Sequence, residues 1–324
     1  MSLSPIDTWP PELLGSSAAV QAAAAAVQHA AAGTEPVLVV AEHGFSAERI
    51  ARAIAVRRPQ PFLVLDCQAG SPESVLRDLF GRADGRRTDV ETVETRSLLA
   101  RARGGTLLLA GVAQLPAAAQ LRLWRVLRDG ELRVGATTTQ LDVRVIAATQ
   151  PGLDREVAEH RFRRDLYDRL QRFRIDVPAL RERRDDLPAI IQAVLAEVCR
   201  SRGIVRRLAP AALTALTALP WTGNLDELRL ALDRLALAVT GETIRQEDVL
   251  ADLRPAPPSP PRFAITGTLR EARLAFEREY IAAVLQEHGW RMSEAARTLG
   301  IERANLYRKT RQLGITRVKP SRVS

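Results

Sequence analysis

The 324-residue chain is predicted to form an α/β domain followed by all-helical parts, and two observations indicate this order. Short apolar, β-branched runs alternate with helical patterns over the first half, at residues 37–41, 62–66, 106–110, 143–148 and 173–177. Near-continuous apolar strands that alternate with helices are typical of a parallel sheet covered on both faces. After Pro178 the strand pattern stops, and only helical patterns follow.

Four parts are expected along the chain. An α/β part over residues 1–178 precedes a small all-helical unit over 179–252, with helices at 187–199, 210–219 and 224–239. Five prolines within residues 254–261 can continue neither a helix nor a ladder, so residues 253–265 are predicted to be an extended linker. Residues 266–324 are predicted to hold a long helix over 268–288 and a shorter helical pair.

Composition excludes several classes of protein. No apolar run approaches the roughly 20 residues that a membrane-spanning helix needs. Residues 1–10 lack a basic start followed by an apolar block, so we expect no signal peptide. Cys67 and Cys199 have no metal-ligand spacing and are expected to be reduced, buried thiols. We expect a cytoplasmic protein that holds no metal.

The excess of positive charge lies at one end of the chain. The formal net charge is +9, and residues 262–324 hold 13 Lys/Arg against 6 Asp/Glu. A basic terminal domain is the electrostatic footprint expected of a protein that binds a phosphate backbone.

A helix-turn-helix is predicted in residues 292–314. Ser293 is suited to cap a short helix, and Ala295 and Ala296 are small enough for a second helix to cross closely. Gly300 supplies the positive φ of a tight turn, and Leu306 lies on the apolar face of the next helix. In this motif the second helix enters the major groove of double-stranded DNA.

The second helix of the pair carries the candidate DNA-binding residues. Residues near the start of such a helix read base edges, where arginine suits guanine and asparagine suits adenine. Later residues are better placed for phosphates, which position the protein without specifying sequence. The candidates for base contact are Arg303, Asn305 and Arg308, and those for phosphate contact are Tyr307, Lys309 and Arg311.

These residues closely resemble the Fis-type helix-turn-helix, with two alanines, then Leu299-Gly-Ile301, then Leu306-Tyr-Arg-Lys309. The resemblance implies that the preceding long helix pairs two subunits. An apolar stripe of Leu274, Ile281 and Leu285 on that helix would serve such a dimer. Packing within one subunit would use the same stripe, so both interpretations stay open.

The first 250 residues resemble the AAA+ ATPase domain of bacterial enhancer-binding proteins, the activators of sigma-54 RNA polymerase. The order and spacing of several stretches carry the likeness, namely residues 79–81, 104–107, 123–131, 143–149, 162–170, 178–188 and 221–228. The resemblance implies a P-loop-like AAA+ parallel sheet with a helical lid. It also implies that the pattern begins by Leu13, which leaves no room for a preceding receiver domain.

The phosphate-binding loop departs from the family pattern. A phosphate loop needs glycines, so that backbone amides face the phosphates, and a lysine that neutralises them. The loop here spans residues 41–48; it keeps Glu42 and Gly44, has bulky Phe45, and places Ala47 where the lysine is expected. The only lysines in the chain are Lys309 and Lys319, so no neighbour in this region can replace it.

Two further positions that ATP hydrolysis needs are also changed. The family carries an Asp-Glu pair after the third strand, which holds Mg²⁺ and polarises water, whereas this chain has Ala110 and Gly111. Asp226 stands where the lid arginine would meet the γ-phosphate. We expect no catalytic residue and no cofactor, with ATP binding weak or absent.

Two arginines match the family's arginine fingers, which act on nucleotide bound by a neighbouring subunit. They are Arg163 and Arg169, and Thr149 matches the sensor position with Gln150 in place of asparagine. The arginines would serve either structural salt bridges or, in trans, an active AAA+ homologue.

The loop that contacts sigma-54 in the family also differs. Residues 85–90 align with it; Gly85 and Thr88 match, but the apolar tip is replaced by Arg87. ATP-driven remodelling of sigma-54 polymerase is therefore not expected.

The sequence is interpreted as a DNA-binding transcriptional regulator that does not hydrolyse ATP. Its AAA+ part would serve as an oligomerisation or interaction platform, in a dimer through the C-terminal helices or in an AAA+ ring. The alternatives are an ATP-binding sigma-54-dependent activator and a non-catalytic partner subunit of an active homologue. A pocket for another ligand, such as a cyclic nucleotide, also stays open.

Overall fold

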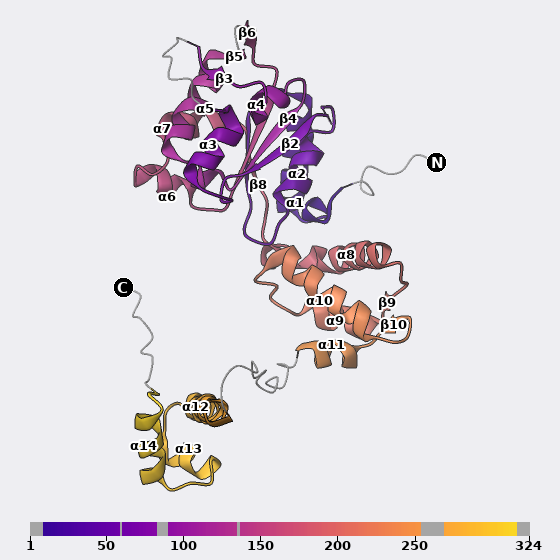
Figure 1. Ribbon diagram of the computed structural model, residues 1–324. Helices are drawn as coiled ribbons and strands as arrows, with labels where there is room; N and C mark the ends of the chain where they lie inside the picture. Colours follow the sequence, from indigo (N-terminus) through magenta and orange to yellow (C-terminus); the bar gives the residue numbers. More distant parts are fainter. Residues whose placement is uncertain (1–8, 59, 83–89, 135–136, 254–268, 316–324) are drawn as a thin grey trace. The chain divides into compact units, whose positions relative to one another are not determined.

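A computed structural model describes residues 9–58, 60–82, 90–134, 137–253 and 269–315. The chain divides into two compact units between Arg254 and Pro255, and each is described by itself (Figure 1). The predicted linker at 253–265 lies almost wholly outside the described residues.

The first unit is built on a five-stranded parallel sheet of order β2-β4-β7-β1-β8. Its strands are β1 (Val37–Val40), β2 (Phe62–Asp66), β4 (Thr106–Ala110), β7 (Arg144–Thr149) and β8 (Arg174–Asp176). All five predicted runs form strands, and the predicted α/β class with a parallel sheet is confirmed. The central strands β1, β4 and β7 are buried along nearly their whole length, which is why their sequences are continuously apolar.

Helices cover both faces of this sheet (Figure 1). One face carries α1 (Ala18–Ala32) and α2 (Ala47–Ile54); the other carries α3 (Pro72–Phe80), α4 (Leu98–Arg101), α5 (Ala117–Asp129), α6 (Leu153–Ala158) and α7 (Arg164–Leu170). Successive strand residues point to opposite faces. Val39 and Leu108 therefore join the core beneath α1 and α2, whereas Leu38 and Leu107 join the larger core on the other face.

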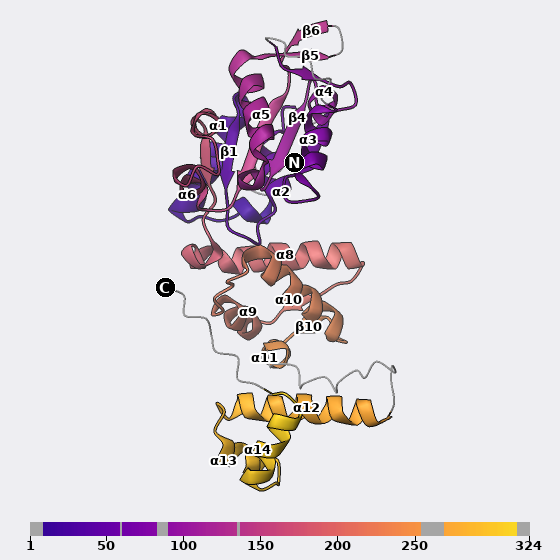
Figure 2. The ribbon, with the colours of Figure 1, turned by 60° about the vertical axis from the view of Figure 1, so that its left-hand side comes forward.

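A second, smaller sheet was not predicted from the sequence. It has the order β3-β5-β6, with β3 (Thr92–Val93), β5 (Glu131–Val134) and β6 (Thr137–Gln140). The antiparallel pair sets Glu131 opposite Gln140. Strand β6 is polar throughout and mostly exposed, so it has no apolar periodicity to detect. Figure 2 shows this sheet at the end of the α/β part that is remote from α8 and α10.

The lid of the first unit contains α8 (Leu187–Arg202), α9 (Pro210–Thr217), α10 (Asn224–Ala238) and α11 (Gln246–Leu253). The prediction of an all-helical unit was wrong in one respect, because β9 (Arg207–Leu208) and β10 (Thr243–Ile244) form a parallel pair. Two-residue strands are too short to show a period of two. The apolar faces of the helices meet in one core around Ile190, Trp221 and Leu232.

Arg144 is a buried cation that joins two helix ends to the sheet. The residue is 2% exposed; it donates 2.5 Å to the carbonyl of Ala30 and 3.4 Å to that of Ile54, at the C-terminal ends of α1 and α2. A cation at a helix C-terminus is favourable because the last carbonyls carry partial negative charge. Burial and the nearby Arg58 lower the pKa of Arg144.

Arg144→Met is therefore expected to destabilise the fold by about 2–3 kcal/mol, because two carbonyl acceptors lose a charged donor. Urea denaturation followed by circular dichroism measures this loss. Arg155→Met is the matched control, since its ion pair with Glu159 is 78% exposed on the arginine side, and exposed ion pairs contribute little to stability. Equal losses in the two variants would contradict the assigned role.

The second unit contains α12 (Leu269–Glu287), α13 (Met292–Thr298) and α14 (Arg303–Gln312). Ile281 and Leu285 pack against Ala295, Ala296 and Leu306 in a small core. The apolar stripe predicted on α12 is thus divided: Ile281 and Leu285 serve the core of one subunit, whereas Leu274 is 47% exposed.

The predicted cap of α13 was wrong. The helix starts at Met292 with Arg291 at the N-cap position and no side-chain cap, so Ser293 lies inside the first turn. Serine next to the true boundary gives the same sequence signal as serine at it, because helix ends are uncertain by one or two residues.

Candidate functional site

A cleft of about 520 Å³ opens at the ends of β1, β4 and β7 in the first unit. The carboxyl ends of parallel strands form the usual ligand-binding edge of an α/β sheet. The sequence positions Glu42, Gly44, Ala47, Gly111, Thr149 and Asp226 are brought together here. The polar lining residues are Glu42, His43, Gln68, Gln114, Thr149, Gln150, Arg155, Glu156 and Asp226.

Two backbone amides at the start of α2 donate hydrogen bonds to side chains of the same chain. Ala47 is its first residue, and Ser46 caps the helix by accepting a hydrogen bond of 3.3 Å from the amide of Arg49. The amide of Ser46 itself donates to a carboxylate oxygen of Glu12 over 3.4 Å. In a phosphate-binding loop, amides of this kind face the ligand. Here two of them have internal acceptors, and no lysine stands beside them.

Gly111, which follows β4, adopts a backbone conformation that favours glycine. Its φ of +67° and ψ of 41° lie in the left-handed region, which glycine adopts most readily. A Cβ at this position would lie 2.8 Å from Nε2 and 3.0 Å from Cγ of Gln68. Ala110, the last residue of β4, offers no oxygen either. The side chain of Gln68 therefore lies where a side chain at position 111 would begin.

Glu42 is bound by the lid. Arg181 donates to its two carboxylate oxygens over 2.6 Å each, and Asn224 donates to it over 3.2 Å. The hydrogen bonds from Arg181 hold the pKa of Glu42 below its usual range. The sequence analysis missed Arg181 and Asn224, because they lie 139 and 182 residues away in the chain and no local pattern joins them to Glu42. Asp226, in the first turn of α10, also lines the cleft.

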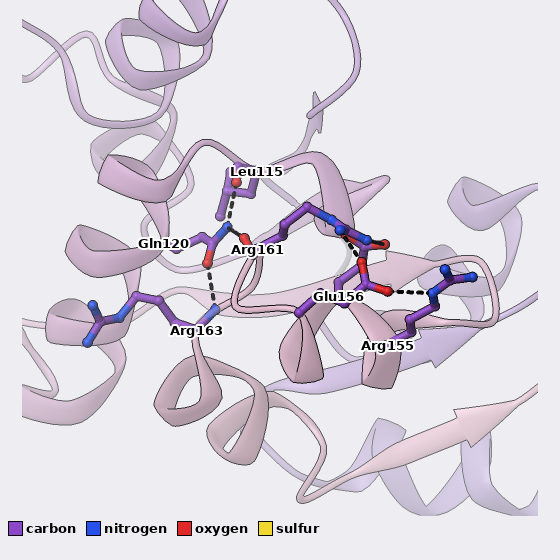
Figure 3. A network of polar contacts seen from close by, with 7 residues as sticks. Leu115, Gln120, Arg155, Glu156, Arg161 and Arg163 are labelled. Atoms are coloured by element: carbon purple, nitrogen blue, oxygen red, sulfur yellow. Dashed lines mark hydrogen bonds and ion pairs between the residues drawn. The ribbon is translucent and has the colours of Figure 1, made fainter.

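Arg163 stands at the start of α7, where Gln120 of α5 fixes the backbone (Figure 3). The buried amide of Gln120 accepts from the Arg163 amide over 2.8 Å and donates to the carbonyls of Leu115 and Arg161. The Arg163 side chain points away from this network and is 39% exposed. Its guanidinium forms a two-bond ion pair with Asp165, which raises the pKa of Arg163.

The other two positions taken from the family pattern are Arg169, in α7, and Thr149, in β7. Arg169 lies 3.5 Å from a carboxylate oxygen of Glu35 and is 28% exposed. Thr149 ends β7 at the cleft, and its hydroxyl donates to the carbonyl of Gln150 over 3.1 Å. Residues 83–89, which include the aligned positions Gly85, Arg87 and Thr88, lie outside the described residues.

The second unit presents a basic helix. Arg303, Tyr307, Arg308 and Arg311 of α14 are exposed, and Asn305 is half-buried and accepts from Arg308 over 3.1 Å. Lys309 is turned back to α12, where its ammonium donates to Glu277 over 2.8 Å. That pairing lowers the pKa of Glu277. Five of the six predicted DNA-binding residues are therefore not paired with an acidic side chain within the described residues, and Lys309 is.

The described helices include none long and apolar enough to cross a bilayer.

Comparison with known families matches three consecutive parts of the chain. Residues 13–176 match the Sigma-54 interaction domain, residues 181–264 the AAA+ ATPase lid domain, and residues 273–313 the bacterial regulatory protein, Fis family. Fold and motifs together define a transcriptional regulator with an AAA+ domain and a DNA-binding helix-turn-helix.

Individual relatives agree. The chain is 34% identical to the nitrogen assimilation regulatory protein NtrX of Azorhizobium caulinodans, covering 95% of this chain and 70% of that protein. It is 33% identical to the DNA-binding transcriptional regulator NtrC of Salmonella typhimurium, covering 94% and 70%. The structure of NtrX from Brucella abortus in complex with ATP is similar, with a TM-score of 0.70, 31% identity, and 93% and 69% of the two chains covered. The chain belongs to the family of sigma-54-dependent, NtrC- and NtrX-type enhancer-binding regulators.

Proposed function

We propose that this chain is a sequence-specific transcriptional regulator of the bacterial cytoplasm whose AAA+ domain does not hydrolyse ATP. The observation that carries the proposal is that Ala47, Gly111 and Asp226 line one cleft, and that Ala110 ends β4 just before Gly111. The family resemblance aligns these residues with the lysine, the two carboxylates and the arginine that hydrolysis needs. The AAA+ domain would then act as an oligomerisation or protein-interaction platform for the DNA-binding unit.

Weak or absent ATP binding is part of this proposal. The Brucella NtrX relative has been solved with ATP. In this chain, a polyphosphate would meet carboxylates of Glu42, Glu156 and Asp226 around the cleft and no lysine. Arg181 already pairs with Glu42 and Arg155 with Glu159, so their charges are compensated within the chain. We also propose that the arginine-tipped stretch 85–90 does not deliver an apolar contact to sigma-54.

Double-stranded DNA is the proposed partner of α14. Arg303, Asn305 and Arg308 would read bases, and Tyr307 and Arg311 would contact phosphates. A second copy of the chain is the proposed partner of α12. Leu274, Phe276 and Tyr280 are 47%, 42% and 53% exposed there, and the two rings stack with centroids 5.7 Å apart. A dimer would pair two recognition helices on a two-fold DNA site. The AAA+ ring remains the alternative assembly.

Selection of DNA sites by the full-length chain, with and without Mg-ATP, tests this function. The proposal expects one enriched sequence motif, bound with the same affinity in both conditions. Failure to enrich any motif would contradict sequence-specific regulation. An affinity for DNA that rises with ATP would contradict the proposal that the cleft binds ATP weakly or not at all.

Lys309 is expected to act mainly through its ion pair with Glu277, which holds α14 against α12. Arg311→Ala should make the negative slope of log affinity against log salt shallower by about 0.9, the effect of one lost phosphate contact. Lys309→Ala should weaken binding to all sites with a smaller change of slope. Fluorescence anisotropy over a salt series measures both, and equal slope changes would assign Lys309 to a phosphate.

A non-catalytic partner subunit is the second candidate function. The observation in its favour is the exposed Arg163 side chain on a backbone fixed by Gln120. Co-purification with an ATP-hydrolysing homologue, and loss of that homologue's turnover on Arg163→Ala, would support it. Unchanged turnover would leave Arg163 with the structural ion pair to Asp165.

A further inference from the structure

The loop between β1 and α2 is hydrogen-bonded to the lid at several points. Besides the ion pair of Glu42 with Arg181, Asn224 donates to the carbonyl of His43 over 2.8 Å. The amide of Asp226 donates to the carbonyl of Gly44 over 3.0 Å. A Cβ on Gly44 would lie 2.0 Å from the carbonyl oxygen of Gly223, so loop and lid backbones are in direct contact.

Phe45 adds an apolar contact at the same place. Its half-buried ring packs both against the core of the lid and against the core beneath α1 and α2. The guanidinium carbon of Arg183, from the lid, lies 5.6 Å from the centre of the ring. Arg183 is 1% exposed, and burial lowers its pKa to about 10. A cation over an aromatic face is most favourable where water is excluded.

Two further links reinforce this junction. The carboxylate of Asp186 accepts from the amides of Ser16 and Ser17, at 2.7 and 3.0 Å, where α1 begins. Arg49 of α2 donates to both carboxylate oxygens of Glu197 on α8 at 2.9 Å. The lid is therefore joined to the α/β part by charged and apolar contacts of the chain itself.

We propose that residues 42–45 form an internal latch, which holds the lid closed on the α/β part without nucleotide. The guanidinium of Arg181 donates two hydrogen bonds to the carboxylate of Glu42, and the guanidinium of Arg183 lies over the ring of Phe45. Both lid arginines therefore contact the loop. In this respect the inference deepens the proposed function, because it supplies the contacts that a domain without ATP needs to keep one conformation. The DNA-binding unit would then be attached to a platform of fixed shape, independent of nucleotide.

Amide hydrogen exchange of the full-length protein, read by mass spectrometry, tests the latch. Without nucleotide, peptides of α8 and α10 should be protected like those of β1 and β7, and Mg-ATP should change neither. Arg181→Gln should speed exchange in the lid helices by about fivefold and Phe45→Ala by about tenfold or more, because each removes contacts that oppose local opening. The sheet should change by less than about twofold.

Arg202→Gln is the matched control. Its ion pair with Asp233 resembles that of Arg181 with Glu42 in length and exposure, at 2.7 against 2.6 Å and 48% against 46% exposed arginine, but lies within the lid. Should Phe45→Ala fail to fold, the comparison of Arg181→Gln with Arg202→Gln decides alone. Equal effects of these two variants, a wild-type lid that exchanges freely, or lid protection that rises with Mg-ATP would each overturn the latch.

Phosphate release measured on the same samples separates the two proposals. ATP turnover together with an unchanged, protected apo lid would overturn the proposed function and leave the latch standing. A lid that exchanges freely, together with no ATP turnover, would overturn the latch and leave the proposed function standing.

Discussion

Replacing Arg303 by alanine is expected to lower the affinity for a selected DNA site by about 1–3 kcal/mol, with the loss concentrated at one base pair. Arg303 is the first residue of α14 and is exposed. Its guanidinium makes no ion pair or hydrogen bond to another described residue, so its donors remain available to two acceptors of a guanine. The loss of such a two-bond contact relaxes the preference for that base.

Fluorescence anisotropy with the selected site and its single-base variants measures this effect. The Arg303→Ala variant should bind the best site and one class of single-base variant with nearly equal affinity. Arg245→Ala is the control, because Arg245 is an arginine of the lid that is 71% exposed and lies outside the helix-turn-helix. A uniform loss over all DNA variants would instead assign Arg303 to a phosphate.

The second large effect concerns a variant into which the ATPase groups of the family pattern are introduced. Combining Ala47→Lys, Ala110→Asp and Gly111→Glu is expected to leave phosphate release at background and to destabilise the first unit. A side chain at Gly111 costs about 1–2 kcal/mol in the left-handed region, and it must also displace Gln68. Asp226 remains at the cleft, and the loop remains bonded to Arg181 and Asn224.

The double variant Ala47→Lys with Ala110→Asp, which keeps Gly111, isolates the backbone effect. It should melt within a few degrees of the wild type, whereas the triple variant should melt lower by roughly 2–4 °C per kcal/mol lost, the scaling for a domain of about 250 residues. Differential scanning calorimetry and a coupled phosphate assay give both readings. Turnover in the triple variant would mean that the cleft lost only side chains and kept the geometry of a hydrolytic site.

The sequence predicted the main sheet well for a physical reason. Strands β1, β4 and β7 are buried on both faces, so each must be a continuous apolar run. Strands β6, β9 and β10 could not be found in this way. The first is polar and mostly exposed, and the other two have only two residues each, so pairing with neighbours rather than local composition defines them.

For the candidate site too, local sequence patterns could be predicted, whereas contacts between distant segments could not. Ala47, Ala110 and Gly111 could be placed from the sequence because each has a fixed distance from a recognisable strand. The contact of Gln68 with Gly111, and that of Arg181 with Glu42, depend on how distant segments pack, and no spacing encodes them. For α14 the residue pattern identified the basic helix, but only the structure shows that Lys309 is engaged by Glu277.

ATP binding and hydrolysis by the full-length wild-type protein test the central claim most directly. Isothermal titration calorimetry with Mg-ATP, beside a phosphate-release assay with and without the selected DNA, is the measurement. The account predicts no release above the protein-free background in either condition, and no saturable heat of binding at millimolar ATP. Phosphate release that DNA stimulates and that chelation of Mg²⁺ abolishes would contradict it, and would identify the cleft as a working ATPase site.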